Sequence, residues 1–205
     1  MDLGALFRRR PPRIADRAAL AEFIDRNAAF LVQKGIYEYA RARAGHFSKV
    51  MFGEAGFQEA VEISRWRAYP LGLAMVGELA EGMLRPAWGD DRIVQREAFL
   101  ATVMSIFDRY PVPTVLGETV WAELRAELAR RLHQVGLHAP KRAIDIPEIY
   151  AQEYFDLFPI HAKLRSAEFG TTRNYLRITM ANIFDELEKR LDVAAVAGSP
   201  AAPPA

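Results

Sequence analysis

Hydrophobic residues recur through most of the chain at the three- and four-residue spacing of an amphipathic helix, and strict alternation over more than four residues is hard to find. Short loops separate the predicted helices, which span approximately residues 16–44, 57–84, 91–109, 114–135, 147–158 and 172–192. The pattern shows no internal repeat and no convincing domain boundary. We therefore expect one all-α, bundle-like domain of six or seven helices.

The first predicted helix begins after Asp16, a good N-cap residue, and stops at Gly45. Its large aromatic residues recur every seven positions, at Phe23, Phe30 and Tyr37, and other hydrophobic side chains occupy a second side. A helix that is hydrophobic on more than one side is typically surrounded by other helices. The spacing therefore predicts a central position for this helix.

Two later helices have predicted capping residues. Asp90 is placed to cap the helix over 91–109, and Thr114 is placed to open the helix over 114–135. Gly136 follows the second of these helices and is the natural residue at its C-terminal end. Both helices are expected to be amphipathic, with one face toward the core.

The stretch RWRAYPLGLAMVGELAEGML, residues 65–84, combines hydrophobic character with residues that weaken a helix, namely Pro70, Gly72, Gly77 and Gly82. A proline inside a helix costs about 3 kcal/mol and each glycine about 1 kcal/mol, so packing must hold this segment. Pro70 either kinks one continuous helix, the interpretation we favour, or begins a second helix after Tyr69. We expect a proline-kinked central helix.

The small residues of this stretch allow a close neighbour, which is either another helix or a ligand. Tight helix packing around Gly77 is the more common arrangement. The alternative is a cavity beside Pro70, lined by Met75 and Leu79, with Glu78 or Glu81 as its polar group. A filled core around Gly77 would favour packing alone, whereas an enclosed void beside a buried Glu78 would favour a ligand site.

The residues before the proline form a candidate site for an anionic group. Arg65 and Arg67 flank Trp66 and could bind a carboxylate or a phosphate. Such arginines more often pair with neighbouring acidic side chains and cover an aromatic ring. The candidate ligand-binding residues are therefore Arg65, Trp66, Arg67, Met75 and Gly77.

The composition sets limits on the chemistry of the protein. Of its 205 residues 51% are hydrophobic and 26% are charged, which suffices for a core without disulfides or metals. The chain has no cysteine, which excludes disulfides, thiolate nucleophiles and cysteine-ligated metal sites. The net charge of +1 and the lack of a basic recognition helix argue against sequence-specific binding of nucleic acid.

The ends of the chain differ from its body. Residues 1–14 form a basic arm, with one acidic residue, Asp2, against Arg8, Arg9, Arg10 and Arg13. Each basic residue contributes about 1 kcal/mol on an anionic membrane, so the arm alone would bind only weakly. We expect the all-α domain to occupy residues 15–192, and residues 193–205, rich in alanine and proline, to be disordered.

The sequence contains no secretory signal and no hydrophobic run of about 18 residues, so we expect a cytoplasmic protein. No serine lies in a G-x-S-x-G motif, no histidine lies in a zinc or di-iron motif, and no phosphate-binding glycine loop is present. No metal or cofactor is predicted. The weak catalytic candidates are Glu78, Glu81 and His161.

Two functions are compatible with this pattern. The first is a non-catalytic interaction or accessory protein that presents a helical surface to a protein partner. The second is a binder of a small, largely apolar molecule in a cavity near Pro70, or an enzyme that acts on such a molecule, most plausibly a hydrolase. The absence of a catalytic motif favours the first function.

Overall fold

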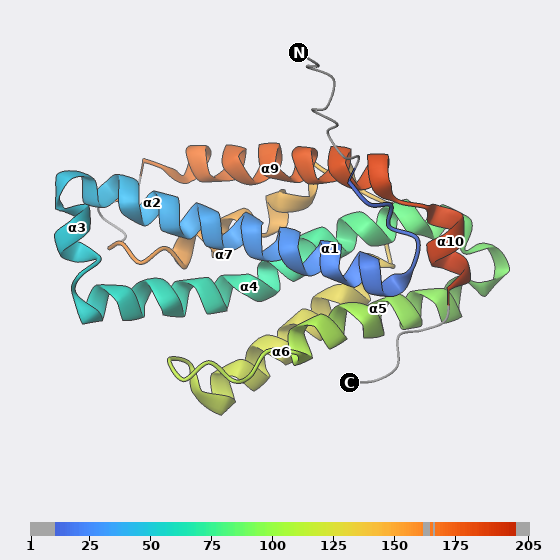
Figure 1. Ribbon diagram of the computed structural model, residues 1–205, viewed down its shortest axis with the longest axis horizontal. Helices are drawn as coiled ribbons and strands as arrows, with labels where there is room; N and C mark the ends of the chain where they lie inside the picture. Colours follow the sequence, from blue (N-terminus) through green and yellow to red (C-terminus); the bar gives the residue numbers. More distant parts are fainter. Residues whose placement is uncertain (1–10, 162–164, 166, 200–205) are drawn as a thin grey trace, which may run out of the picture.

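The computed structural model describes residues 11–161, 165 and 167–199, and in this part of the chain the regular secondary structure is helical, without strands. The predicted all-α class is therefore confirmed. The long helices lie side by side along the molecule, with α3 at one end and α10 near the other (Figure 1). The α-helices are α1 (Arg17–Ala29), α2 (Gly35–Ala44), α3 (Ser48–Met51), α4 (Ala55–Leu84), α5 (Arg92–Asp108), α6 (Gly117–Val135), α7 (Ala151–Asp156), α9 (Phe169–Arg190) and α10 (Val193–Gly198).

The first predicted helix is confirmed as a continuous helical segment, but it contains an irregularity that the sequence did not indicate. Asp16 caps α1 as predicted, because its Oδ1 atom accepts a hydrogen bond of 2.7 Å from the backbone N–H of Ala19. A π-helical turn, Phe30–Lys34, then joins α1 to α2. The hydroxyls of Tyr154 and Tyr175 donate hydrogen bonds to backbone carbonyls of this turn, at 2.9 and 3.0 Å.

The π-helical turn changes which side chains face the core. Phe23 is buried, whereas Phe30 and Tyr37 are each 46% exposed. The seven-residue spacing of the three aromatic residues therefore does not mark one buried line. A π-turn holds an extra residue, so it rotates the positions that follow it, including Tyr37, relative to those of a regular α-helix.

Helix α4 is the centre of the molecule. It is continuous from Ala55 to Leu84 with Pro70 inside it, so the kinked-helix interpretation is confirmed over that of two separate helices. Its course changes direction partway along (Figure 1), as expected where a proline removes a backbone hydrogen bond. Every residue over 68–81 is buried, because α1, α5, α6 and α9 all pack against this helix.

A close helix crossing explains the first glycine after the proline. A Cβ atom at Gly72 would lie 2.7 Å from the backbone oxygen of Ala28 in α1, closer than real Cβ atoms come. Glycine is therefore required where α1 crosses α4. At Gly82, a Cβ atom would lie 3.3 Å from the Cβ atom of Pro140, so this glycine lets the loop after α6 lie close to α4.

Several predicted boundaries need correction. Asp90 does not cap α5, because residues Gly89–Asp91 form a 3-10 turn and no side chain caps the helix. Helix α6 begins at Gly117, whose φ of 74° suits glycine, and not at Thr114. The predicted helix over 147–158 is a 3-10 turn, Ile146–Ile149, followed by the short α7.

The two ends of the domain are joined. The backbone N–H of Ile14 donates to the carbonyl of Arg190 at 2.8 Å, and the N–H of Asp192 donates to the carbonyl of Ile14 at 2.9 Å. Ile14 is buried, Pro12 accepts a hydrogen bond of 3.0 Å from Arg190, and Arg13 pairs with Asp192, so residues 12–14 of the predicted arm contact the domain. Residues 1–10, including Arg8, Arg9 and Arg10, lie outside the described part of the chain.

The prediction of a disordered tail is wrong for its first six residues. Residues 193–198 form α10, which Asp192 caps by accepting a hydrogen bond of 3.2 Å from the N–H of Ala195. Val196 is buried against the core. Few large hydrophobic residues are present here, so the local composition did not predict a helix. One buried valine and one capping aspartate are enough to hold this short helix on the domain.

Candidate functional site

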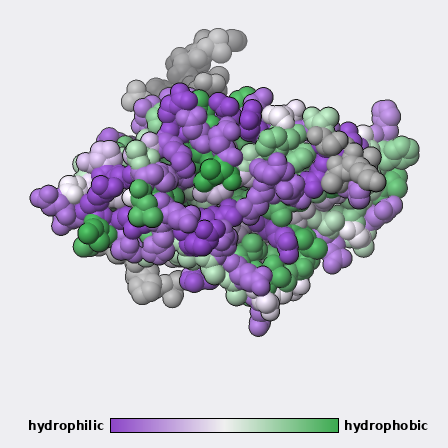
Figure 2. Space-filling view, turned by 180° about the vertical axis from the view of Figure 1, so that it is seen from behind, coloured by the Kyte–Doolittle hydropathy of each residue, from purple (hydrophilic) through white to green (hydrophobic). Residues whose placement is uncertain are grey.

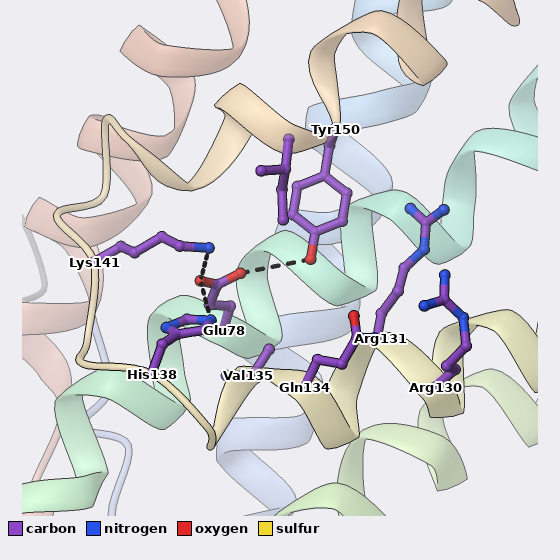
Figure 3. Close-up of a pocket in the computed structure, with 9 residues that line it drawn as sticks. Glu78, Arg130, Arg131, Gln134, Val135, His138, Lys141 and Tyr150 are labelled. Carbon is purple, nitrogen blue, oxygen red and sulfur yellow. Dashed lines mark hydrogen bonds and ion pairs between the residues drawn. The ribbon is translucent and has the colours of Figure 1, made fainter.

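A pocket of about 290 Å³ opens between α4, the second half of α6 and the segment 138–150 (Figure 3). Helix α4 contributes a single residue to its lining, Glu78. The rest of the lining comes from Arg130, Arg131, Gln134, Val135, His138, Lys141, Ile149 and Tyr150. Most of these side chains are polar, so this is a polar pocket beside the hydrophobic core.

Glu78 is the most deeply buried charged residue of the lining, with 4% of its surface exposed. It belongs to the stretch 68–81 of α4, in which every residue is buried. Three polar groups converge on its carboxylate (Figure 3): Lys141 Nζ at 2.8 Å and His138 Nε2 at 3.8 Å from Oε1, and the Tyr150 hydroxyl at 3.5 Å from Oε2.

The partners of Glu78 leave one of its oxygens incompletely satisfied. The contact with Lys141 is within ion-pair distance but does not have hydrogen-bond geometry, so Oε1 has no hydrogen-bond partner in the described part of the chain. A buried carboxylate oxygen without a hydrogen bond is costly, and such a group calls for a functional explanation. Oε1 is therefore the atom of the pocket that is best placed to accept a hydrogen bond from a ligand.

Tyr150 can act only as a hydrogen-bond donor toward Glu78 at neutral pH. Burial, together with the neighbouring Glu78 carboxylate, raises the pKa of its hydroxyl well above the ordinary value of tyrosine. The ring lies beside the guanidinium of Arg131, whose Cζ atom is 5.5 Å from the ring centroid. Tyr150 is thus held in a fixed orientation at the junction of Glu78 and α6.

The arginines of the pocket already have acidic partners. Arg130 donates to Glu127, with its Nε atom 2.8 Å from a carboxylate oxygen, and Arg131 donates to Glu127 and Glu153 at 2.6 Å each. Hydrogen bonds from Arg130 and Arg131 lower the pKa of Glu127 to about 2. Because Lys141 likewise faces Glu78, each formal positive charge around the pocket has a carboxylate partner.

Glu81, the second predicted acidic candidate, lies elsewhere and is fully occupied. It is buried and accepts a hydrogen bond of 2.8 Å from Nε of Arg85, one turn further along α4. Arg85 also donates to the backbone carbonyls of Val135 and His138, at 3.1 and 2.5 Å. This buried pair therefore attaches the C-terminal end of α6 to α4 and fixes the backbone of His138 beside the pocket.

The predicted basic site before the proline is not part of this pocket. Arg65 donates to Gln33 at 3.2 Å, Arg67 is exposed, and the indole N–H of Trp66 donates to Glu62 at 3.1 Å. Glu62 is thus the partner of the tryptophan and not of an arginine. His161 is exposed and does not line the pocket.

Met75 and Gly77 lie in a filled core. Met75 is fully buried, and a Cβ atom at Gly77 would meet Leu132 at 3.4 Å and Val103 at 3.6 Å, which is ordinary packing. Leu79 lines a different pocket from Glu78, so these residues do not share the single cavity of the alternative interpretation. The packing around Gly77 agrees with the close helix contacts that we favoured from the sequence.

The structure also reveals a polar cluster that the sequence did not indicate. The hydroxyls of Tyr69 and Tyr110 donate to Oδ1 of Asp25 at 2.6 and 2.9 Å. Burial, followed by the hydrogen bond to Asp25, raises the pKa of both hydroxyls above the ordinary value. The cluster joins α1, α4 and the end of α5, and because its hydroxyls have partners we assign it a structural role.

The pocket residues that sequence analysis missed are on α6 and the following segment. His138 and Lys141 lie in a loop rich in charged and proline residues, which is a weak signal for a site. Their approach to Glu78, 60 or more positions earlier in the chain, depends on how α6 crosses α4. Local sequence pattern carries no information on that crossing.

Neither a metal site nor a membrane-spanning helix occurs among the described residues. Within 11–161, 165 and 167–199, no group of three or more histidine or acidic residues has the arrangement of a metal site. Across the same residues, no helix has the length and hydrophobicity needed to cross a membrane.

Comparison with protein-family models, curated proteins and solved structures finds no match for this chain. The functional argument therefore depends on the geometry of the pocket alone. Its central element is a buried carboxylate that faces a lysine, a histidine and a tyrosine hydroxyl at the base of a polar pocket.

Proposed function

We propose that this protein binds a small, polar molecule in the pocket above Glu78, and that the molecule donates a hydrogen bond to the Glu78 carboxylate. The observation that carries this proposal is the buried Oε1 atom, which has no hydrogen-bond partner in the described part of the chain. A ligand donor at this atom would add a hydrogen bond to the ion pair that Oε1 already makes with Lys141.

The charges around the pocket favour a ligand without net charge. Each arginine of the lining is paired with Glu127 or Glu153, and Lys141 is paired with Glu78. A dianion would therefore find no unpaired cation there, and a cation would have to displace Lys141. An uncharged or zwitterionic molecule with hydroxyl or amide groups fits this environment, in contrast to the largely apolar ligand of the alternative function that the sequence left open.

The pocket supports binding more strongly than catalysis. Its lining contains no serine, threonine or cysteine that could act as a nucleophile. A hydrolase would have to use Glu78 to activate water, and Lys141 Nζ already lies 2.8 Å from that carboxylate. We therefore propose that the protein binds its ligand without chemical change. The pocket does not support the alternative prediction of a hydrolase.

The interaction or accessory function remains a second proposal, because one observation favours it. The core around Gly77 is filled, which is the arrangement that we expected of a helical bundle acting through its surface. A ligand-binding pocket and a partner surface are compatible in one domain, since the pocket lies at the edge of the core and not inside it.

The proposal can be tested by blocking the pocket without disturbing the core. Gln134 lines the pocket and is exposed, so Gln134→Trp should fill it, whereas His133→Trp alters an exposed neighbour outside the lining. Ligand-observed NMR with a panel of small hydroxyl and amide compounds should show binding to the native protein and to His133→Trp, and none to Gln134→Trp.

A second variant tests the role of the carboxylate. Glu78→Gln should weaken the same compounds about tenfold or more, because hydrogen bonds to charged groups are the stronger class. Equal binding to the native protein, Gln134→Trp and Glu78→Gln would refute the proposal, since it would place the compounds outside this pocket.

A further inference from the structure

The turn between α2 and α4 presents hydrophobic side chains to solvent. Its residues 45–51 form the short 3-10 helix Gly45–Phe47 and α3. Phe47 is 71% exposed and Val50 is 62% exposed. We call residues 45–51 the α3 tip, because α3 lies at one end of the molecule, where the long helices α2 and α4 meet (Figure 1).

The α3 tip lies in a basic part of the chain. Residues 39–53 contain no aspartate or glutamate, and they include Arg41, Arg43, His46 and Lys49; the exposed Glu38 and Glu54 lie directly outside this range. Arg41 and Lys49 are exposed, and Arg43 pairs with Glu168 at 3.1 Å. Figure 2 shows hydrophobic and hydrophilic atoms next to each other at the end of the molecule where α3 lies.

The inner side of the turn is already filled by aromatic rings. Phe52 packs between Tyr37 and Phe57, with ring centroids 5.1 Å apart in both pairs. This packing fixes the turn against α2 and α4. The hydrophobic side chains of the α3 tip are thus held outward on a rigid support.

We propose that the α3 tip binds an anionic lipid surface, with Phe47 and Val50 entering the headgroup region and Arg41 and Lys49 contacting anionic headgroups. Interfacial membrane binding combines buried hydrophobic side chains with basic residues in this way. A stable protein interface buries about 800 Å² on each partner, more than a small convex tip can offer. The proposal is independent of the ligand pocket.

The absence of cysteine allows a direct test in the full chain. Val50→Cys would carry the only thiol, which can be labelled with a fluorophore whose emission moves to shorter wavelength in an apolar environment. Vesicles of phosphatidylcholine containing about 30% phosphatidylserine should cause this shift, and vesicles of phosphatidylcholine alone should not. The matched control is Val94→Cys in α5, which is also exposed and should show no shift.

A charge variant distinguishes binding through the α3 tip from a general attraction between the protein and anionic vesicles. In the labelled protein, Lys49→Glu should weaken binding to the anionic vesicles at least about fivefold. Lys189→Glu, an exposed lysine in the last turn of α9, should leave binding unchanged. An equal loss in both variants, an equal shift with both vesicle types, or no shift at all would overturn the proposal. A heparin-induced shift as large as that with vesicles would also overturn it, because it would assign the tip to polyanions in general.

Discussion

Two glutamates of α4, three positions apart, show how residues of one type take different roles according to their partners. Glu78 and Glu81 are both buried, and the sequence identified both as candidates. The partner of Glu81 is Arg85, one turn away on the same helix, so this pair was within reach of sequence reasoning. The groups around Glu78 come from residues 138–150, so the difference between the two glutamates depends on the tertiary structure.

Glu81→Gln should lower the free energy of unfolding by about 3 kcal/mol, because it leaves Arg85 buried without its charged partner. Urea denaturation measures this change. Glu123→Gln, which alters an exposed residue of α6, is the control and should have little effect. A loss below about 0.5 kcal/mol for Glu81→Gln would show that this pair does not attach α6 to α4 as the geometry indicates.

At the level of helices, hydrophobic spacing predicted which segments are helical but not their internal irregularities. The continuity of α4 through Pro70 followed from the sequence, since hydrophobic residues continue on both sides of the proline. The π-helical turn Phe30–Lys34 did not, because the tyrosine hydroxyls that bond its carbonyls come from α7 and α9. The 3-10 turn before α7 likewise replaced part of a predicted helix.

Substitution by alanine is expected to change the stability of the protein in opposite directions at two glycines of α4. Gly72→Ala should destabilise the protein by about 1–3 kcal/mol, because the new Cβ atom would meet the backbone of α1. Gly77→Ala should be neutral or stabilising by up to about 1 kcal/mol, because its Cβ atom would make ordinary contacts and alanine favours the helix. Thermal unfolding of the two variants tests the crossing, and a lower melting temperature for Gly77→Ala than for Gly72→Ala would contradict it.

The tyrosines that bond the π-helical turn predict a loss of stability at alkaline pH. Burial raises the pKa of Tyr175 to about 12, compared with 10.0 for an ordinary tyrosine. Between pH 10 and pH 12 the hydroxyl of Tyr175 is deprotonated in the unfolded chain but protonated in the folded chain. The free energy of unfolding therefore decreases as the pH rises through this range, and below pH 10 the stabilising contribution of Tyr175 is complete.

The test compares native protein with Tyr175→Phe. From pH 8 to pH 11, Tyr175→Phe should lose about 1 kcal/mol less stability than the native protein, because it no longer carries this ionisable group. Urea midpoints at the two pH values measure the difference. Identical losses in the two proteins would mean that the Tyr175 hydroxyl is not held protonated by the fold.

For the whole molecule, the composition and spacing correctly predicted an all-α fold. The boundaries of the domain were less predictable. Ile14 and Leu191 pair although they are far apart in the sequence, and α10 begins two residues after Leu191. Such contacts between the ends of a chain leave no periodic pattern. The pocket shares this property, since Glu78, Arg131 and Tyr150 meet only when α4, α6 and the segment before α7 are packed.

The closure of the domain can be tested at Val196. Val196→Ser should lower the free energy of unfolding by about 2 kcal/mol, because it replaces a buried hydrophobic side chain of α10. Ala194→Ser changes an exposed residue of the same helix and should have little effect. Equal stability of the two variants in urea denaturation would mean that residues 193–198 do not pack on the domain.

The most direct test of the proposed ligand pocket is native mass spectrometry of the protein purified from its own host, compared with Gln134→Trp prepared in the same way. The native protein should retain a small molecule as a discrete additional mass, and Gln134→Trp should lack this mass, because tryptophan fills the space beside Glu78. An identical additional mass on both proteins, or a bare chain in both, would contradict the account.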